Sequence, residues 1–226
     1  CDGLISVGGG SAMDTAKGIK ALLMTDIAHV RANQLPPEGK VPHLAIPGTA
    51  GTGAETTAVA VLYEDGQKLS VDHPALLPDG VLLDGSLLDT LPEYHRKSCA
   101  MDALAQGIES WWAKRATPGS RIHAERAIRG VLDNLTAYLQ GDRKAQDEML
   151  HAAYESGAAI LTTRTTAAHA MSYQITKKLG AAHGHACMLT LPHLWAHLAA
   201  QAEYQPMLTE LAHILSGEKP MDGAML

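Results

Sequence analysis

The chain lacks three features that would each point to a particular class of protein. It has only three cysteines in 226 residues, widely spread and without a Cys-x-x-Cys pair, which argues against a disulfide scaffold and suits a reducing compartment. No apolar run approaches the roughly 18 residues needed to span a bilayer, and the first residues show no signal-peptide pattern. These absences lead us to expect a cytoplasmic protein with no membrane partner.

An excess of positive charge is also missing. The formal net charge of −6 argues against a nucleic-acid partner, because such binding needs a basic patch or stripe. The contents of hydrophobic residues (46%) and charged residues (19%) are ordinary for a soluble globular protein. The length allows one large domain or two small ones. The chain contains no Phe, and nothing in the sequence explains that absence.

The first ninety or so residues alternate short apolar runs with loops rich in Gly and Pro. A helix is expected from Ser11 to about Met24, and the Glu64–Gln67 segment between two apolar runs is a hairpin signal. A strand–helix–strand order with continuous apolar strands predicts a parallel sheet covered by helices. Strands are expected at residues 4–7, 41–46, 58–63, 68–71 and 81–83.

Helical periodicity dominates from Pro92 onward, so we place a boundary near residue 91. Ser120 is the predicted N-cap of the second of these helices. The abrupt start in a buried strand, and the equally abrupt end, lead us to expect an excerpt of a longer protein. Helices are expected at residues 92–113, 119–139, 143–162, 166–178, 185–200 and 205–215.

A glycine turn, Gly8-Gly9-Gly10-Ser11, follows the first strand and opens a helix. Glycines let the backbone approach a phosphate, and the free N–H groups of a helix start donate to it. Ser11 is expected to cap the helix, with Asp14 reaching back as a capping box. The turn matches neither GxGxxG nor a P-loop, in which Lys17 would be wrongly spaced. A plain strand–helix turn is an equal alternative.

A second loop, residues 47–57, follows the second expected strand and holds three glycines and four threonines in eleven positions. Its hydroxyl and backbone groups would donate hydrogen bonds at close range. A flexible surface loop is the alternative, although such a loop more often carries Ser, Asn and Lys. Loops after successive parallel strands meet at the carboxyl edge of the sheet, where open α/β sheets bind ligands.

Four residues of the second half suggest a metal site. Asp102 and Gln106 are four residues apart on a predicted helix, so they share a face. His169 lies near the start of another helix, and His183 lies in a glycine-flanked turn. A carboxylate with two imidazoles suits Zn²⁺ or Fe²⁺ and leaves an open position for a substrate oxygen.

Histidine spacing alone is a weak guide, because the chain contains twelve histidines. His193 and His197 form a rival pair, spaced four residues apart on one predicted helix. No acidic residue lies near them in sequence. A partly exposed helix face is therefore the favoured interpretation of that pair.

Four motifs in order, GGGSAMDTAK, AIPGTAGTGAETT, MDALAQGIES and HAMSY…HGHACMLTLPH, resemble the iron-containing (group III) alcohol dehydrogenase family over essentially the whole chain. The resemblance implies a dehydroquinate synthase-like fold, α/β plus all-α. A dinucleotide-binding domain would occupy residues 1–91 and a helical metal and substrate domain residues 92–226. It also implies NAD(P)H, a divalent metal (Fe²⁺ or Zn²⁺), a small aldehyde or alcohol substrate, and a possible homodimer.

The resemblance assigns roles to individual residues. Asp102, His169 and His183 match three of the family's four metal ligands. Gln106 occupies the position of the fourth, a histidine, and an amide oxygen is only a weak ligand. Tyr173 stands where the family often has another histidine. The cofactor-binding candidates are the turn residues Gly9, Gly10, Ser11 and Asp14, with Thr49, Thr52, Leu83 and Lys68, the last near the nicotinamide ribose.

Within the family, the stretches MDALAQGIESWWAKRAT, TTRTTAAHAMSY and HGHA resemble the phosphonoacetaldehyde reductase branch, which implies reduction of phosphonoacetaldehyde to 2-hydroxyethylphosphonate. Arg164, in a stretch with four threonines, is the candidate that grips the phosphonate in a bidentate fork; a solvated charge at a helix end is the equal alternative. Hydride would add to a carbonyl polarised by the metal. The alkoxide would then be protonated through water, with His185 as a candidate relay or, alternatively, a residue that orients the His183 loop.

Three other functions stay open. The chain could come from a general short-chain alcohol dehydrogenase of the same family. It could come from a dehydroquinate synthase-like lyase, although such enzymes carry more basic residues around the metal. A nucleotide-binding relative without turnover is the third, because Gln106 stands in a ligand position. The sequence does not distinguish NAD from NADP or Fe²⁺ from Zn²⁺.

Overall fold

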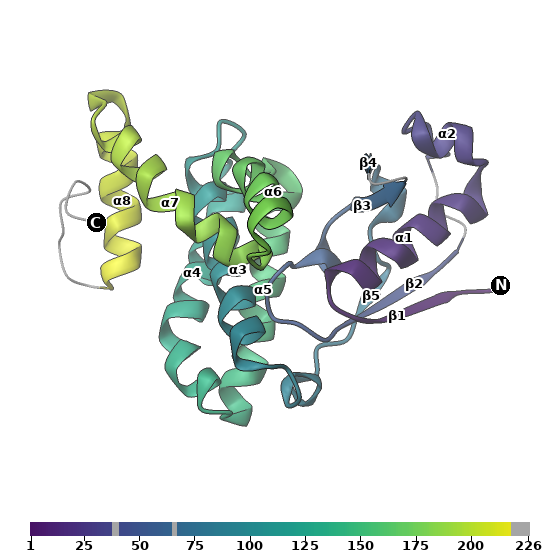
Figure 1. Ribbon diagram of the computed structural model, residues 1–226, viewed down its shortest axis with the longest axis horizontal. Helices are drawn as coiled ribbons and strands as arrows, with labels where there is room; N and C mark the ends of the chain where they lie inside the picture. Colours follow the sequence, from purple (N-terminus) through teal and green to yellow (C-terminus); the bar gives the residue numbers. More distant parts are fainter. Residues whose placement is uncertain (38–40, 65–66, 218–226) are drawn as a thin grey trace.

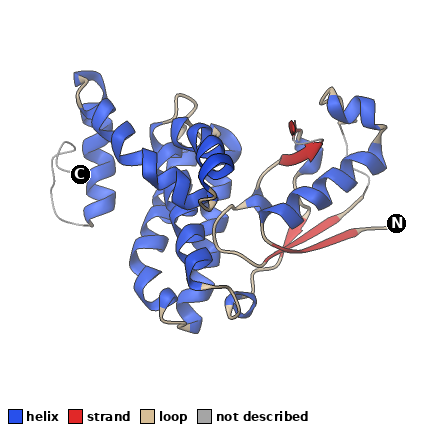
Figure 2. Cartoon of the chain, in the orientation of Figure 1, coloured by secondary structure: helices blue, strands red, loops and turns tan. Residues whose placement is uncertain are grey.

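The chain folds into a strand-containing half followed by an entirely helical half (Figure 1). The structure is a computed structural model that describes residues 1–37, 41–64 and 67–217. The strands lie on one side of the molecule and the helices of residues 93–216 on the other (Figure 2). This arrangement confirms the predicted fold class, a parallel sheet followed by a helical part. The division into two domains at residue 91 stays a prediction.

The parallel sheet has the strand order β1-β2-β5, with β1 at Leu4–Gly8, β2 at His43–Pro47 and β5 at Gly80–Val81. The expected strand at 81–83 is therefore misplaced. The Leu82 N–H still bonds to the second strand, but Asp84 then caps a 3₁₀ turn that leads the chain away from the sheet.

A separate antiparallel hairpin lies beside the helix α1 (Gly10–Met24). Its strands are β3, Val59–Glu64, and β4, Gln67–Asp72, paired from end to end. The predicted hairpin is thus confirmed, while residues 65–66 of its expected turn lie outside the described residues. Leucines of both strands pack on the small cluster that α1 contributes to.

All six helices expected in the second half are present, each within two residues of its predicted bounds. The short helix α2, Ile27–Arg31, was not expected. The later helices are α3 (Glu93–Trp112), α4 (Pro118–Leu139), α5 (Arg143–Thr163), α6 (Ala167–Leu179), α7 (His183–Ala199) and α8 (Gln205–Ser216).

Both predicted helix caps are wrong. Gly9 is the N-cap of α1 and no side chain caps it; Ser11 lies inside the helix, so Asp14 closes no capping box. Thr117, not Ser120, caps α4, and the two residues exchange the hydrogen bonds of a capping box. The shift follows from Pro118, whose fixed φ suits the first helical position and so makes the preceding residue, Thr117, the cap.

The loop of residues 47–57, here called the threonine loop, follows β2 and packs against the helical half. Its Ala50 belongs to the main hydrophobic core of the helical half, which also takes Leu88 from the segment before α3. Gly53 has a left-handed backbone (φ 57°) and lies so close to Gly157 of α5 that a Cβ would strike its backbone. Only glycine meets both demands. The loop after β2 is therefore fixed against the helices rather than free at the surface.

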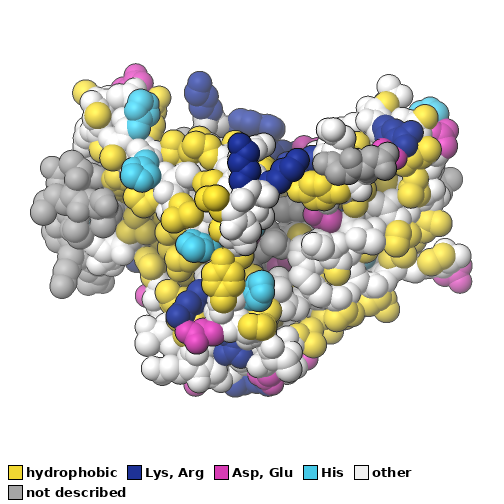
Figure 3. Space-filling model, viewed as in Figure 1, with side chains coloured by type: hydrophobic (Ala, Val, Ile, Leu, Met, Phe, Trp, Pro, Cys, Tyr) yellow, Lys and Arg dark blue, Asp and Glu magenta, His cyan; other side chains and the backbone are white. Residues whose placement is uncertain are grey.

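One face of the parallel sheet is not covered by helices. Ile5 and Val7 of β1 are 69% and 57% exposed, and hydrophobic side chains line the lower edge of the strand-containing half (Figure 3). Parallel sheets are ordinarily covered on both faces. Among the described residues, the structure has no helix that is long and apolar enough to cross a membrane.

Candidate metal and cofactor site

Four potential metal ligands converge where α3, α6 and α7 meet. They are Asp102, His169, His183 and Cys187, and one ligand atom of each lies within 4.8 Å of all the others. Asp102 Oδ1 is 3.2 Å from His169 Nε2 and 3.6 Å from His183 Nε2. The structure therefore brings together three of the residues that the family resemblance assigns to the metal. It adds Cys187, which the sequence did not single out.

A glycine contact brings the start of α7 against α3. Gly184 lies directly on the backbone of Ser98 and Asp102, where any Cβ would clash. This close approach sets His183, the first residue of α7, beside Asp102 in the middle of α3. His169 reaches the same point from the first turn of α6.

Hydrogen bonds fix which nitrogen of each histidine faces the centre. His169 Nδ1 contacts the Glu109 carboxylate, so this nitrogen carries a proton and donates it. Ser172 Oγ donates to the His169 carbonyl and lies 3.1 Å from His183 Nδ1, so that nitrogen donates to the hydroxyl. Both Nε2 atoms are thereby left to face Asp102 with their lone pairs, the arrangement in which a metal-binding histidine is held.

Glu109 is the part of this site that sequence reasoning missed. The side chain is completely buried and accepts backbone hydrogen bonds from Thr166 at 3.1 Å and Ala168 at 2.9 Å, besides its contacts with the Thr166 hydroxyl and the His169 ring. A signal was present, because Glu109 lies seven residues after Asp102 and so falls on the same helix face. A carboxylate behind a ligating histidine orients the ring and raises its basicity.

The charges of the cluster depend on one another. Burial acts to raise the pKa of Asp102, but the hydrogen bond from His169 and the charges of the two histidines outweigh it and lower the pKa. Burial acts to lower the pKa of His169, but bonds to Asp102, Cys187 and Glu109 raise it well above its ordinary value. The His183 pKa is also raised, because Cys187 and Asp102 outweigh burial. The two histidines lower the Cys187 pKa against burial.

This donor set fits a divalent metal. A carboxylate oxygen and two imidazole lone pairs repel one another at these distances unless a cation lies between them, either a proton or a metal ion. Three of the four groups are buried, and only the side chain of His183, 36% exposed, leaves the centre open on one side. Oxygen and nitrogen donors with one open side suit catalytic Zn²⁺ or Fe²⁺.

Gln106 lies in the same cleft, but its amide has other partners. Its Nε2 donates to the Thr52 carbonyl at 3.2 Å, and its Oε1 accepts from the Ser156 hydroxyl at 2.8 Å. Gln106 thus fastens the threonine loop to α5. Ligation by its amide stays a prediction, and it would compete with the bond from Ser156.

A cleft of about 1060 Å³ extends from the cluster between the two halves. That volume is at the upper end of the ~300–1,000 Å³ typical of ligand sites. The loops after β1 and β2 both reach it, through Gly10, Ser11 and Thr52, and the Gly48 N–H bonds to the Gly8 carbonyl at 2.8 Å. Ten of the predicted site residues line the cleft: Gly10, Ser11, Asp14, Thr52, Lys68, Asp102, Gln106, Arg164, His169 and His183.

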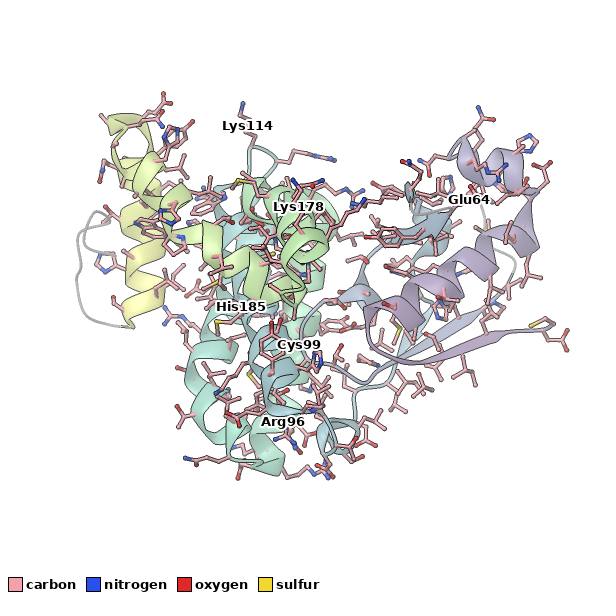
Figure 4. The ribbon with its side chains drawn as sticks, viewed as in Figure 1. Glu64, Arg96, Cys99, Lys114, Lys178 and His185 are labelled. Carbon is pink, nitrogen blue, oxygen red and sulfur yellow. The ribbon has the colours of Figure 1, made fainter. Side chains whose placement is uncertain are left out.

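The other predicted site residues lie elsewhere. Gly9 and Thr49 pack against each other, outside the lining of this cleft. Leu83 lines a second cavity, of about 740 Å³. His185 lies on another side of α7, near Cys99 (Figure 4), where its Nδ1 is 3.2 Å from the Tyr94 hydroxyl. A proton relay through His185 stays a prediction.

Two cationic side chains of the cleft already have partners. The Arg164 guanidinium pairs with the Asp72 carboxylate at 2.5 Å, which links the end of α5 to β4, and Arg164 itself has a positive φ of 63°. The Lys68 ammonium lies 3.7 Å from the centre of the Tyr173 ring. Contact of Arg164 with a phosphonate stays a prediction, and such contact would compete with Asp72.

Lys17 is wrongly spaced from the glycine turn for a P-loop lysine. Its side chain is buried and holds two segments of the fold together. Its ammonium donates to the carbonyls of Ala54 at 2.6 Å and Val59 at 2.9 Å and to the Thr57 hydroxyl at 3.0 Å. Burial lowers its pKa to about 8, with Asp14 and Glu55 acting in the opposite direction. Lys17 therefore ties α1, which follows the glycine turn, to the threonine loop.

Comparison with known proteins agrees with this geometry. The protein-family model described as "Iron-containing alcohol dehydrogenase" matches residues 1–85. The family model for the C-terminal part of Fe-containing alcohol dehydrogenases matches residues 97–224. The chain belongs to the iron-containing alcohol dehydrogenase family. The family resemblance read from the four motifs is thereby confirmed.

Two curated relatives in the family act on different substrates, by their names. The phosphonoacetaldehyde reductase of Streptomyces viridochromogenes is 36% identical over 208 residues, covering 85% of this chain and 52% of the relative. The NAD-dependent methanol dehydrogenase of Bacillus methanolicus is 33% identical, covering 93% of this chain and 57% of the relative. The chain thus spans about half the length of the curated relatives it matches.

A solved structure shares the fold. Sulfoacetaldehyde reductase from Bifidobacterium kashiwanohense, in complex with NAD⁺, has a TM-score of 0.89 and 30% identity to this chain, covering 100% of this chain and 61% of that chain. The match includes both the strand-containing half and the helices, so the cleft between them is part of the shared fold.

Proposed function

We propose that the protein reduces a short aldehyde that carries an anionic group, with NAD(P)H as the hydride donor and a divalent metal, Fe²⁺ or Zn²⁺, at the Asp102 cluster. The observation that carries the proposal is the single cleft in which the glycine turn, the threonine loop and the Asp–His–His cluster meet. Phosphonoacetaldehyde, reduced to 2-hydroxyethylphosphonate, is the proposed substrate.

Different residues of the cleft would bind the metal and the cofactor. Asp102, His169 and His183 would hold the metal, which supplies Lewis-acid polarisation of the carbonyl oxygen when bound. Backbone N–H groups at the start of α1, around Gly10 and Ser11, would donate to the cofactor pyrophosphate. Thr52 would donate from the facing loop.

Positive charge in the cleft supports the proposal that the substrate carries an anionic group. Lys177 lines the cleft on α6, the helix that carries His169, and it has no carboxylate partner among residues 1–37, 41–64 and 67–217. Lysine and arginine side chains gather along the upper edge where the two halves meet (Figure 3). Two relatives of the chain, the phosphonoacetaldehyde and sulfoacetaldehyde reductases, are named for two-carbon aldehydes with a strong anion.

Turnover by the full-length protein tests the proposal. NADH and NADPH oxidation is followed with phosphonoacetaldehyde, acetaldehyde and lactaldehyde, each with Fe²⁺, Zn²⁺ or a chelator. Metal-dependent turnover that favours the phosphonate supports it. Equal turnover of all three aldehydes keeps the dehydrogenase and discards the phosphonate. The absence of turnover with every metal would favour a lyase or a non-catalytic relative.

A pair of lysine variants isolates the contribution of charge. Lys177→Met is expected to raise KM for phosphonoacetaldehyde at least about tenfold, the cost of one charge-assisted bond, and to leave KM for acetaldehyde unchanged. Lys178→Met is the matched control, because Lys178 is the next residue on α6 and does not line the cleft (Figure 4). Equal effects of the two variants would remove Lys177 from the proposal.

Two further expectations belong to the whole protein. The family resemblance implies a homodimer, which analytical ultracentrifugation of the full-length protein tests. A cytoplasmic location is inferred from cysteine usage, and fractionation of the source cells tests it.

A further inference from the structure

Cys187 is a buried thiol whose position the proposed function does not use. It lies four residues after His183 on α7, one helical turn further along the same face. Its side chain is fully buried, and its Sγ is 4.0 Å from His183 Nε2. Sγ belongs to the set of four ligand atoms that lie within 4.8 Å of one another.

The spacing of these atoms is close to that of a four-coordinate metal site. Ligand atoms roughly 2.0–2.3 Å from a tetrahedral Zn²⁺ are about 3.3–3.6 Å apart. Three of the six separations in the cluster are 3.2, 3.6 and 4.0 Å, and all six are within 4.8 Å. The sulfur makes the longest of these three, and a shift of the Cys187 side chain toward His183 would bring this separation into the tetrahedral range.

The competing ligand is held elsewhere. Gln106 bonds through both ends of its amide, to Thr52 and to Ser156, so ligation would compete with the bond that Oε1 accepts from the Ser156 hydroxyl. A neutral amide oxygen is also a weaker donor to Zn²⁺ than a thiolate. Both considerations favour sulfur over the amide.

We propose that Cys187 is the fourth protein ligand of the metal and that Gln106 positions the threonine loop. The inference rests on the proposed metal-dependent function. On binding, the Cys187 S–H bond breaks, a sulfur–metal bond forms and the proton passes to the buffer. Asp102, His169, His183 and Cys187 then form an oxygen–nitrogen–nitrogen–sulfur site, to which the carbonyl oxygen would add as a fifth ligand on the side that His183 leaves open. Its soft donor selects Zn²⁺ over Mn²⁺ and Mg²⁺.

Cobalt substitution tests the ligand directly, without an activity assay. The full-length protein is stripped with a chelator and titrated with Co²⁺, whose thiolate complexes show a sulfur-to-cobalt charge-transfer band in the near ultraviolet. The wild type is expected to show this band together with the visible bands of bound cobalt. Cys187→Ser is expected to lose the band and to bind Co²⁺ at least about tenfold more weakly, the lower limit for losing even an outer partner of a metal ligand.

Two variants serve as controls. Cys99→Ser removes the other thiol of the helical half, which lies three residues before Asp102 on α3 and whose pKa burial raises to about 12, with Asp102 adding to the rise. It is expected to keep the band. Gln106→Ala is expected to keep both the band and the cobalt affinity. Circular dichroism of each variant excludes unfolding as the cause of a loss.

The outcomes separate this inference from the proposed function. Cobalt bound by the wild type without the charge-transfer band overturns the Cys187 ligand and leaves the metal-dependent function standing. A band that survives in Cys187→Ser, or cobalt affinity lost in Gln106→Ala but not in Cys187→Ser, overturns it as well. A wild type that binds no cobalt overturns both.

Discussion

Two buried polar networks face each other across the cleft, and they differ in how their hydrogen-bonding capacity is used. In the strand-containing half, Lys17 directs its ammonium to three protein oxygens, two carbonyls and a hydroxyl. In the helical half, the Nε2 atoms of His169 and His183 face the Asp102 carboxylate, and a proton or a metal ion must lie between these atoms. In the first network, protein oxygens alone accept the hydrogen bonds of the buried ammonium. The second is closed only when a cation is bound.

The comparison teaches how a scaffold can be distinguished from a site when both are buried and charged. Burial and charge are common to the two networks. The distinguishing feature is the direction of the lone pairs, which converge at the Asp102 cluster and are each matched by a donor around Lys17. Variants in the two networks should therefore affect different measurements, namely metal binding in one and folding stability with cofactor binding in the other.

The largest effect is expected from His169→Ala, which removes one of the converging lone pairs. Metal affinity of the full-length protein should fall by more than about 100-fold, beyond the loss typical of an outer partner. Competition with a chromophoric chelator measures it. His193→Ala, an exposed histidine on α7, is the control. Unchanged affinity in His169→Ala would place the metal elsewhere.

A pH dependence is expected from Glu55, a buried carboxyl group of the threonine loop that interacts electrostatically with Lys17. Burial raises the pKa of Glu55 to about 7 from 4.5, against hydrogen bonding and Lys17, and Oε1 has no partner among the described residues. The folded protein therefore retains a proton that the unfolded chain has lost between pH 4.5 and 7, and stability falls as pH rises through that window. At about 1.4 kcal/mol per pH unit, the loss is about 3 kcal/mol.

Glu55→Gln should remove that dependence. Urea unfolding of the two proteins from pH 4.5 to 7.5 measures it, with the slope of the variant expected to be shallower. Parallel curves would mean that Glu55 ionises at its ordinary pH in the folded protein. In that case the network around Lys17 satisfies its carboxylate better than the contacts indicate.

Lys17→Met should lower the free energy of unfolding by about 2 kcal/mol, because buried carbonyls lose their donor while the cost of a buried charge is relieved. The untethered threonine loop should also weaken NADH binding, with metal affinity unchanged. Lys20→Met is the matched control, since Lys20 is also buried on α1 but bonds to Leu77 and Asp79. NADH affinity is measured by calorimetry. Equal affinity in the two variants would mean that Lys17 does not affect cofactor binding through the threonine loop.

The smallest effect is expected from Glu109→Gln, which keeps the shape of the residue behind His169 but removes its charge. Metal affinity should fall by about tenfold, the lower end of the range for partners of a ligating histidine. The same chelator competition measures it, with Glu125→Gln on the surface of α4 as the control. A loss as large as that of His169→Ala would mean that Glu109 maintains the fold of the site as well as the ring orientation.

The sequence by itself determined the order and type of the main elements, though not the short helix α2. Periodicity of apolar residues placed the six later helices within two residues of their bounds, because a helix that packs on one side must repeat its apolar positions every three to four residues. Local signals at the ends were less informative. Ser11 and Ser120 both looked like caps, yet Gly9 and Thr117 occupy those positions.

Only the tertiary structure decided which polar residues form a site. Asp102 and His183 are eighty-one positions apart, and the contact of Gly184 with α3 brings them together. Glu109, Cys187 and Lys17 gained their roles from the same packing, and His185 was directed away from the cleft by a rotation along α7. Motif and spacing record residue type and local period. The direction of a lone pair depends on how separate helices pack against one another, and it cannot be deduced from the residue type at one position.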